Sequence, residues 1–213
     1  MGDGSKAPGE HWEAVYRANT PRGVSWYAPH LQTSVSLILS HPRGKDARVI
    51  DVGGGASTLV DDLLDAGVRR VTVLDIANQA LEYSRARLGA KAAHVTWIAA
   101  DITQTALPEQ TYDVWHDRAV FHFLTNAEDR RRYLAAMRTA LKPGGQAILA
   151  TFALDGPPRC SGLEVVRYSP EALQQELGRG FQLMDTLNEA HQTPFHTTQQ
   201  FMYGRFLRVP DPA

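Results

Sequence analysis

The stretch Val49–Thr58 reads Val-Ile-Asp-Val-Gly-Gly-Gly-Ala-Ser-Thr and gives the clearest indication of the fold. It begins as a short apolar strand, continues through three glycines and leads into residues with the apolar spacing of a helix. Small residues at such a turn let a ligand lie against backbone N–H groups. We therefore predict a ligand-binding loop between a strand and a helix.

Strands and helices alternate around this loop. We predict strands at 48–52, 71–74, 95–99, 112–115 and 146–152, and helices at 58–66, 77–88 and 127–141. This alternation is typical of βαβ units and a parallel, doubly wound sheet. Two further strands, 181–187 and 200–207, are joined by a segment too short for a helical crossover, so they should pair antiparallel.

Composition narrows the class of protein. The 213 residues favour one domain, and 22 Lys and Arg against 23 Asp and Glu give a net charge of -1. That balance disfavours a protein built to bind nucleic acid, and no apolar run is long enough to span a membrane. Cys160 is the single cysteine, which excludes a disulfide framework and a multi-cysteine metal site. We expect a cytoplasmic monomer or homodimer without a metal.

Acidic residues follow the second and third predicted strands. Asp75 stands about 20 residues after the glycines, where a carboxylate accepts hydrogen bonds from both hydroxyls of a ribose. Asp101 is placed to bind the amino group of an adenine, with Ile102 against the ring. These positions predict a nucleoside ligand.

Two nucleoside cofactors fit such a frame. A dinucleotide site favours a glycine at position 58, where this chain has Thr58. Asp51, at the end of the first strand, suits the ammonium of a methionine moiety better than a pyrophosphate. The pattern therefore favours S-adenosylmethionine (SAM) over NAD.

Five segments resemble the class I SAM-dependent methyltransferases: DVGGGAS (51–57), VTVLDI (71–76), AADI (99–102), YDVWHDRAVFHFL (112–124) and LKPGGQAILATF (141–152). The resemblance implies a Rossmann-like α/β fold with a seven-stranded doubly wound sheet. That sheet is mostly parallel with an antiparallel C-terminal strand and has helices on both faces. We expect an N-terminal helical lid segment at 1–45 and the methyltransferase domain at 46–213.

The resemblance also assigns residues to the cofactor, whose product would be S-adenosylhomocysteine (SAH). Trp12, Tyr16 and Trp26 look like an aromatic lid, and aromatic faces favour a sulfonium. The predicted cofactor-binding residues are Trp12, Tyr16, Trp26, Asp51, Gly53, Gly54, Gly55, Ser57, Asp75, Ile76, Asp101, Ile102 and Asp117.

In this family the segment after the fourth strand faces the transferred methyl group. Here it lacks the Asn/Asp-Pro-Pro-aromatic tetrad typical of enzymes acting on nucleic-acid bases. Asp117-Arg118, with Asp129-Arg130 and Gly156-Pro157-Pro158, resembles the thiopurine and thiol S-methyltransferases. Three residues are the predicted catalytic group: His122 as a base, Asp117 beside the reacting centre, and Arg118 holding an acceptor carboxylate or the lid.

The sequence thus indicates methyl transfer to a small-molecule acceptor, with a thiol or another soft nucleophile as the leading candidate. A protein-lysine methyltransferase of the same fold is an alternative. An NAD-linked oxidoreductase and a SAM-binding protein without catalysis are further alternatives. Thr58 and the lack of a separate substrate domain argue against the oxidoreductase.

Overall fold

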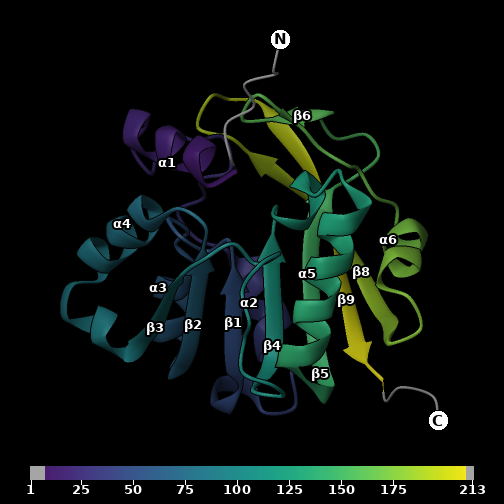
Figure 1. Ribbon diagram of the computed structural model, residues 1–213. Coiled ribbons are helices and arrows are strands. Elements are labelled where there is room, and N and C mark those ends of the chain that lie inside the picture. Colours follow the sequence, from purple (N-terminus) through teal and green to yellow (C-terminus); the bar gives the residue numbers. More distant parts are fainter. Residues whose placement is uncertain (1–7, 210–213) are drawn as a thin grey trace.

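The computed structural model describes residues 8–209, and its centre is a seven-stranded sheet of order β3-β2-β1-β4-β5-β9-β8 (Figure 1). Strands β1 to β5 run parallel, and β9 is antiparallel to both of its neighbours, β5 and β8. The predicted fold class is confirmed. The strands are β1 (Arg48–Val52), β2 (Arg70–Asp75), β3 (Val95–Ala99), β4 (Tyr112–Arg118), β5 (Leu141–Phe152), β8 (Phe181–Gln192) and β9 (Thr198–Arg208).

Helices cover both faces of this sheet (Figure 1). Asn126 caps α5 by accepting the N–H of Glu128, and Ser169 caps α6 by accepting the N–H of Ala172. The α-helices are α1 (Pro8–Ala18), α2 (Gln32–Leu39), α3 (Leu59–Asp65), α4 (Asn78–Leu88), α5 (Ala127–Ala140) and α6 (Pro170–Leu177). Short 3-10 turns are η1 (Gly44–Asp46), η2 (Gly89–His94) and η3 (Phe121–Phe123).

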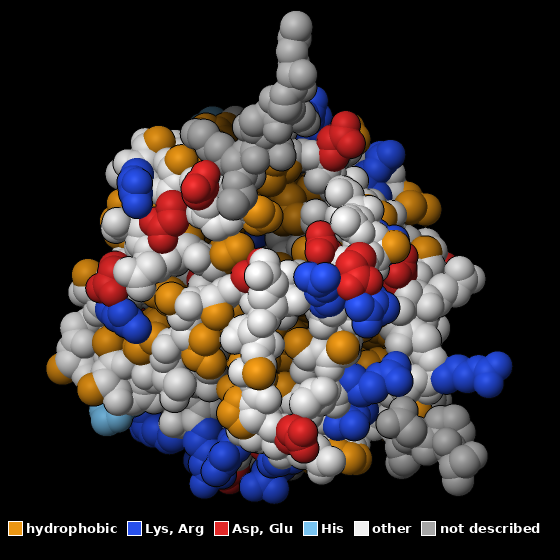
Figure 2. Space-filling model, in the orientation of Figure 1, with side chains coloured by type: hydrophobic (Ala, Val, Ile, Leu, Met, Phe, Trp, Pro, Cys, Tyr) orange, Lys and Arg blue, Asp and Glu red, His pale blue; other side chains and the backbone are white. Residues whose placement is uncertain are grey.

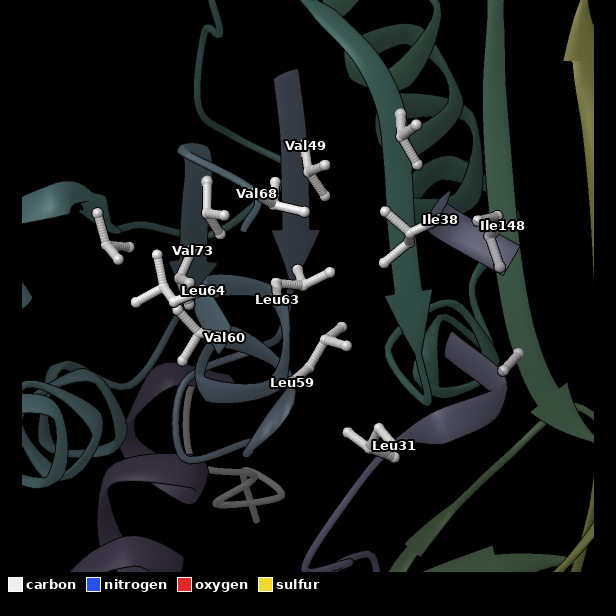
Figure 3. Close-up of a cluster of buried hydrophobic side chains, with 14 of the residues drawn as sticks. Leu31, Ile38, Val49, Leu59, Val60, Leu63, Leu64, Val68, Val73 and Ile148 are labelled. Atoms are coloured by element: carbon white, nitrogen blue, oxygen red, sulfur yellow. The ribbon is translucent and has the colours of Figure 1, made fainter. Parts of the chain in front are cut away.

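Alternation along each strand divides the core between the two faces. Val49 and Ile148 point to one face, where Figure 3 shows them with Leu63 of α3 and Ile38 of α2. Trp115 points to the other face and packs against Tyr133 of α5, with the ring centroids 5.6 Å apart. The sheet is therefore buried on both sides, as its nearly continuous apolar strands require.

The largest differences from the sequence-based expectation lie in three segments. Strand β8 continues to Gln192 instead of ending at 187, because β9 hydrogen-bonds its polar second half. Strand β5 begins at Leu141, where it pairs with Tyr112, although that stretch carries a helix-ending Pro-Gly-Gly. A two-stranded ribbon, β6 (Arg159–Cys160) and β7 (Leu163–Glu164), lies in a segment for which the sequence predicted no strand.

The register brings the ends of the parallel strands together. Val52 of β1 pairs with Leu74 of β2 and with Asp117 of β4, while Asp75 pairs with Ala99 of β3. The residues that follow β1 to β4 therefore meet at one edge of the sheet, which is where ligands bind in open α/β folds.

Candidate active site

The glycine loop after β1 packs closely against its neighbours. Gly53 has a φ of +71°, and its N–H donates to the carbonyl of Leu74 at 2.7 Å. A Cβ at Gly53 would overlap the side chain of Val120, and one at Gly54 would overlap Asp51 Oδ2. Glycine is required at both positions because a side chain would fill the space at the strand ends.

Asp75 stands at the end of β2 with its carboxylate already oriented. Its Oδ2 accepts the N–H of Gly55 and its Oδ1 accepts the N–H of Ala77, both at 2.9 Å. Burial raises the pKa of Asp75 to about 6, against the lowering effect of these two hydrogen bonds. Gly55 lies behind the cavity wall and holds Asp75, which lines the cavity.

A second acidic position follows β3. Asp101 accepts hydrogen bonds from the backbone and hydroxyl of Thr103, at 2.8 and 2.7 Å, and from Gln104 Nε2 at 2.8 Å. These donors fix a tight turn. Ile102 lines the cavity beside Asp101, so the structure brings together the two residues predicted around an adenine, and Ile76 lines the same cavity.

Aromatic residues from the N-terminal segment close the opposite side. Trp12 of α1 lies edge-on to Trp26 and Phe123, with ring centroids 5.8 and 4.9 Å apart. The backbone oxygen of Tyr16 accepts a hydrogen bond from Tyr83 of α4 at 3.1 Å, which ties α1 to the domain. The predicted lid residues Trp12, Tyr16 and Trp26 all line the same cavity.

These elements enclose a cavity of about 770 Å³ at the edge where the strands end. Figure 2 shows this edge hollowed, with hydrophobic side chains in a recess between α1 and the β6–β7 side. The predicted Gly53, Asp75, Ile76, Asp101 and Ile102 form part of its wall. Side chains that the sequence analysis did not assign also line it, among them His11, Phe123, Phe152, Cys160, Leu163 and Phe201.

A smaller cavity of about 40 Å³ adjoins the glycine loop. Asp51, Gly54 and Ser57 line it, together with Gly53 and Arg118. Asp51 is 3% exposed; its Oδ1 lies 2.7 Å from His116 Nδ1, while its Oδ2 has no hydrogen-bond partner among residues 8–209. This cavity therefore offers a buried carboxylate oxygen that is free to accept a donor.

Two of the predicted catalytic residues, Asp117 and Arg118, lie on opposite faces of β4. Arg118 lines both cavities, and its side chain is 7% exposed. Asp117 is fully buried and accepts the N–H groups of Val120 and Phe121 and the hydroxyl of Tyr133, at 2.8, 3.0 and 2.5 Å. Burial raises the pKa of Asp117 to about 6. Its contacts make Asp117 a structural anchor of the turn after β4, away from the cavity wall.

His122 is also fully buried rather than exposed in the cavity. It lies between the rings of Phe123 and Phe152, with centroids 4.5 and 4.7 Å from its own. Burial, with a smaller contribution from Arg118, lowers the pKa of His122 to about 3. Within the described part of the chain, the histidine that lines the cavity is His11, which the sequence analysis did not select.

Residues 8–209 contain neither a metal-binding cluster nor a membrane-spanning helix. No three His, Cys, Asp or Glu side chains in this range are grouped so as to hold a metal ion. No helix in this range is both long and apolar enough to pass through a membrane.

Comparison with known proteins finds similarity to methyltransferases. The profile of a methyltransferase domain family matches residues 49–145. The mouse (Mus musculus) eEF1A lysine and N-terminal methyltransferase is 23% identical over 150 residues. That alignment covers 68% of this chain and 21% of the relative, so the chain spans about a fifth of the curated relative.

Solved structures show the same fold. A structure reported for the conversion of a disulfide bond into a thioacetal group during echinomycin biosynthesis has a TM-score of 0.76 at 19% identity, covering 97% of this chain and 95% of its own. The N-methyltransferase NodS from Bradyrhizobium japonicum WM9, in complex with SAH, has a TM-score of 0.73 at 18% identity, covering 96% and 100%. These similarities establish the class I fold.

The fold, the domain match and the cavity together support a SAM-dependent methyltransferase, with SAM as the cofactor. The residues present fit this cofactor. Asp75 is oriented for a ribose, Asp51 Oδ2 is free for a cationic donor, and the glycines leave the space a Cβ would fill.

Proposed function

We propose that the protein transfers a methyl group from SAM to a small-molecule acceptor whose nucleophile is a thiol or another soft atom. One observation carries this proposal: the 770 Å³ cavity continues past the predicted adenosine residues into an aromatic half. The aromatic half is defined by Trp12, Phe123, Phe152, Leu163 and Phe201.

The chain's own residues supply alignment and a dry environment. SAM, when bound, provides an electrophilic methyl group at its sulfonium. Methyl transfer is an in-line displacement, so the protein must chiefly hold the acceptor in line and exclude water. The rings of Phe152 and Phe201, with centroids 5.0 Å apart, and the Trp12–Phe123 pair form rigid apolar walls for a compact acceptor.

The side chains that could act as a general base in the cavity favour a methyl acceptor whose nucleophile has a low pKa. His122 is buried and Asp117 is occupied by three donors, so neither reaches the cavity. His11 and Asp129 line the cavity, and burial raises the pKa of the Cys160 thiol to about 11. A thiol ionises near a pKa of about 8.5 and needs little assistance, unlike an alcohol or an alkylammonium.

One observation favours a second candidate, a protein-lysine acceptor. The mouse relative is named for lysine and N-terminal methylation, and its alignment covers 68% of this chain. A lysine would have to enter the aromatic half as a neutral amine, and Asp129 is the carboxylate that lines this part of the wall. An aromatic recess fits a small molecule better than an extended peptide.

The test is SAH release from SAM by the purified protein, with panels of small thiols, carboxylic acids, amines, phenols and lysine-containing proteins. We expect release with thiols, and much less with the Asp75→Ala variant. Release only with lysine-containing proteins would instead indicate a protein-lysine methyltransferase. No release with any acceptor, despite SAH binding measured by calorimetry, would overturn both.

A further inference from the structure

Basic side chains gather at the edge of the sheet opposite the cavity, where strands β1, β2 and β5 begin. Figure 2 shows Lys and Arg side chains along the lower edge of the molecule, away from the recess. Of the six residues in this group, five are exposed and the side chain of the sixth, Lys142, is 35% exposed. We call the group the basic edge, and it consists of Arg43, Lys45, Arg48, Arg69, Arg70 and Lys142.

The sheet register places two of these arginines side by side. Arg48 is the first residue of β1 and pairs with Arg70, the first residue of β2. Neighbouring strands lie about 4.8 Å apart, and register partners point to the same face. Arg69 precedes β2, and a Cβ at Gly67 would lie 3.7 Å from Lys45 Cδ, so the Lys45 side chain lies against the same turn. Like charges this close repel one another.

The protein's own carboxylates neutralise only part of this edge. Asp113 Oδ1 accepts from Lys142 Nζ at 2.7 Å, and Asp113 Oδ2 lies 3.6 Å from Arg43 Nε. The same Oδ2 accepts the backbone N–H of Arg48 at 2.8 Å. The remaining four side chains form no ion pair among residues 8–209: Lys45, Arg48, Arg69 and Arg70.

The basic edge carries a local excess of positive charge. Asp65, at the end of α3, is already paired with Lys91 at 2.8 Å. Asp46, Glu109 and the buried Asp113 are the other carboxylates on this edge, against six cations. Three positive charges are therefore in excess here, in a chain whose net charge is -1. The rest of the molecule is net negative.

The width of the edge indicates the kind of partner that fits. It extends from β2 through β1 and β4 to β5, about 15 Å at the usual strand spacing. Guanidinium groups bind carboxylates through paired hydrogen bonds. A nucleic-acid duplex or a membrane presents negative charge over a wider area, where it would also meet the net negative remainder of the chain. A short acidic protein segment matches the edge, because about five extended residues span about 16 Å.

We propose that the basic edge is a docking surface for an acidic segment of a partner protein. Carboxylates of that segment pair with the cations that Asp113 leaves unpaired. The edge lies where the parallel strands begin, and the cavity lies where they end, so a docked partner leaves the cavity open. Docking thus holds the enzyme on its partner without blocking the methyl acceptor, and it is independent of which acceptor the enzyme takes.

The experiment measures binding of fluorescently labelled poly-L-glutamate to the whole protein, by anisotropy at about 50 mM salt. Arg48→Gln with Arg70→Gln removes two adjacent charges, and we expect the affinity to fall by about 3- to 20-fold. Wild-type binding should be lost at about 1 M salt, where charges are screened beyond about 3 Å.

The matched control is Arg131→Gln with Arg132→Gln. It removes the same charge from an exposed part of α5, where both arginines pair with Glu128. Because these residues lie outside the basic edge, the affinity for poly-L-glutamate should change less than about twofold.

Thermal unfolding separates docking from a structural role. Arg48 and Arg70 repel one another, so the double variant should unfold at the same temperature as the wild type or at a higher one. Its rate of SAH release should be unchanged, because the edge is remote from the cavity. If this variant fails to fold, Lys45→Gln with Arg69→Gln removes the other two unpaired charges and should give the same loss of binding.

Three results would overturn the inference. The first is wild-type protein that does not bind poly-L-glutamate at low salt. The second is an equal loss of affinity in the α5 control, which would assign the binding to the general charge of the protein. The third is tighter binding of duplex DNA or of phosphatidylserine vesicles at matched charge concentration, lost in the edge variant, which would assign the edge to another class of partner.

Discussion

The affinity for SAH should fall as the pH is lowered from 7 to 5, because Asp75 must be ionised to accept the ribose hydroxyls. Asp75 is 6% exposed, and each carboxylate oxygen already accepts one backbone N–H at 2.9 Å. Burial nevertheless raises the pKa of Asp75 to about 6. Hydroxyl donors favour the ionised carboxylate, so binding competes with protonation.

The size of the effect follows from that pKa. A carboxyl group with a pKa of about 6 is about 90% ionised at pH 7 and about 10% ionised at pH 5, so the apparent Kd should rise about tenfold. Stability of the free protein moves the other way. The folded chain holds this proton more tightly than the unfolded chain, so raising the pH from about 4 through 6 removes up to about 3 kcal/mol.

The assay is isothermal titration calorimetry of SAH at pH 5, 6 and 7 and constant ionic strength. Wild-type binding at pH 5 should release nearly one proton, which appears as a dependence of the heat on the ionisation enthalpy of the buffer. Asp75→Asn keeps the shape and removes the titration, so its weaker binding should be independent of pH. A wild-type affinity that stays constant, or an Asn variant that keeps the tenfold slope, would refute the reasoning.

Three further substitutions test the buried contacts of Asp75, Asp117 and His122. Gly55→Ala would place a Cβ 2.5 Å from Asp75 Oδ2, so we expect a loss of about 1–3 kcal/mol in urea unfolding together with weaker SAH binding. Tyr133→Phe leaves Asp117 with one buried donor fewer and should cost about 1–3 kcal/mol, measured by the same unfolding, with kcat preserved in the folded fraction. The pKa of His122 is about 3 in the folded protein, below its unfolded value, so the wild type loses about 1.4 kcal/mol of unfolding free energy for each pH unit below about 6.5. His122→Phe should remove this part of the pH dependence of the unfolding free energy. A base role for His122 would instead appear as a loss of kcat at neutral pH.

The sequence predicts the parallel half of the sheet well because its signals are local. Strand β1 and strand β3 begin and end where their apolar runs do. The second half of β8 could not be predicted in this way, because residues such as Asn188 and Gln192 are polar. They form a strand since β9, which follows in the chain, supplies hydrogen-bond partners along that length.

The alternation of side chains between the two faces of β4 explains why some predicted site residues reach the cavity and others do not. Trp115 and Asp117 share one face of β4, and that face packs against Tyr133 of α5. His116 and Arg118 share the opposite face, toward α2 and the glycine loop. Counting alternate positions from the apolar Trp115 would have assigned Asp117 to the core and Arg118 to the site.

The residues of one half of the cavity come from short local motifs, and those of the other half come from separated segments. Only the first half could therefore be predicted from the sequence. Asp75 ends β2 and Ile76 follows it, while Asp101 and Ile102 lie within three residues of the end of β3, so a short motif specifies both the residue and its position. The aromatic half is assembled from widely separated segments: Trp12 in α1, Phe123 after β4, Phe152 at the end of β5, Leu163 in β7 and Phe201 in β9.

No local pattern links such positions, because their proximity results from the insertion of β9 beside β5 and from the docking of α1 on α4. The same separation has a functional consequence. Substitutions at Trp12, Phe152 or Phe201 should reshape the proposed acceptor half while the strand-end residues proposed to hold the nucleoside stay in place. Acceptor specificity in this fold is therefore free to change without loss of the cofactor, and the acceptor must be identified by experiment on the aromatic half.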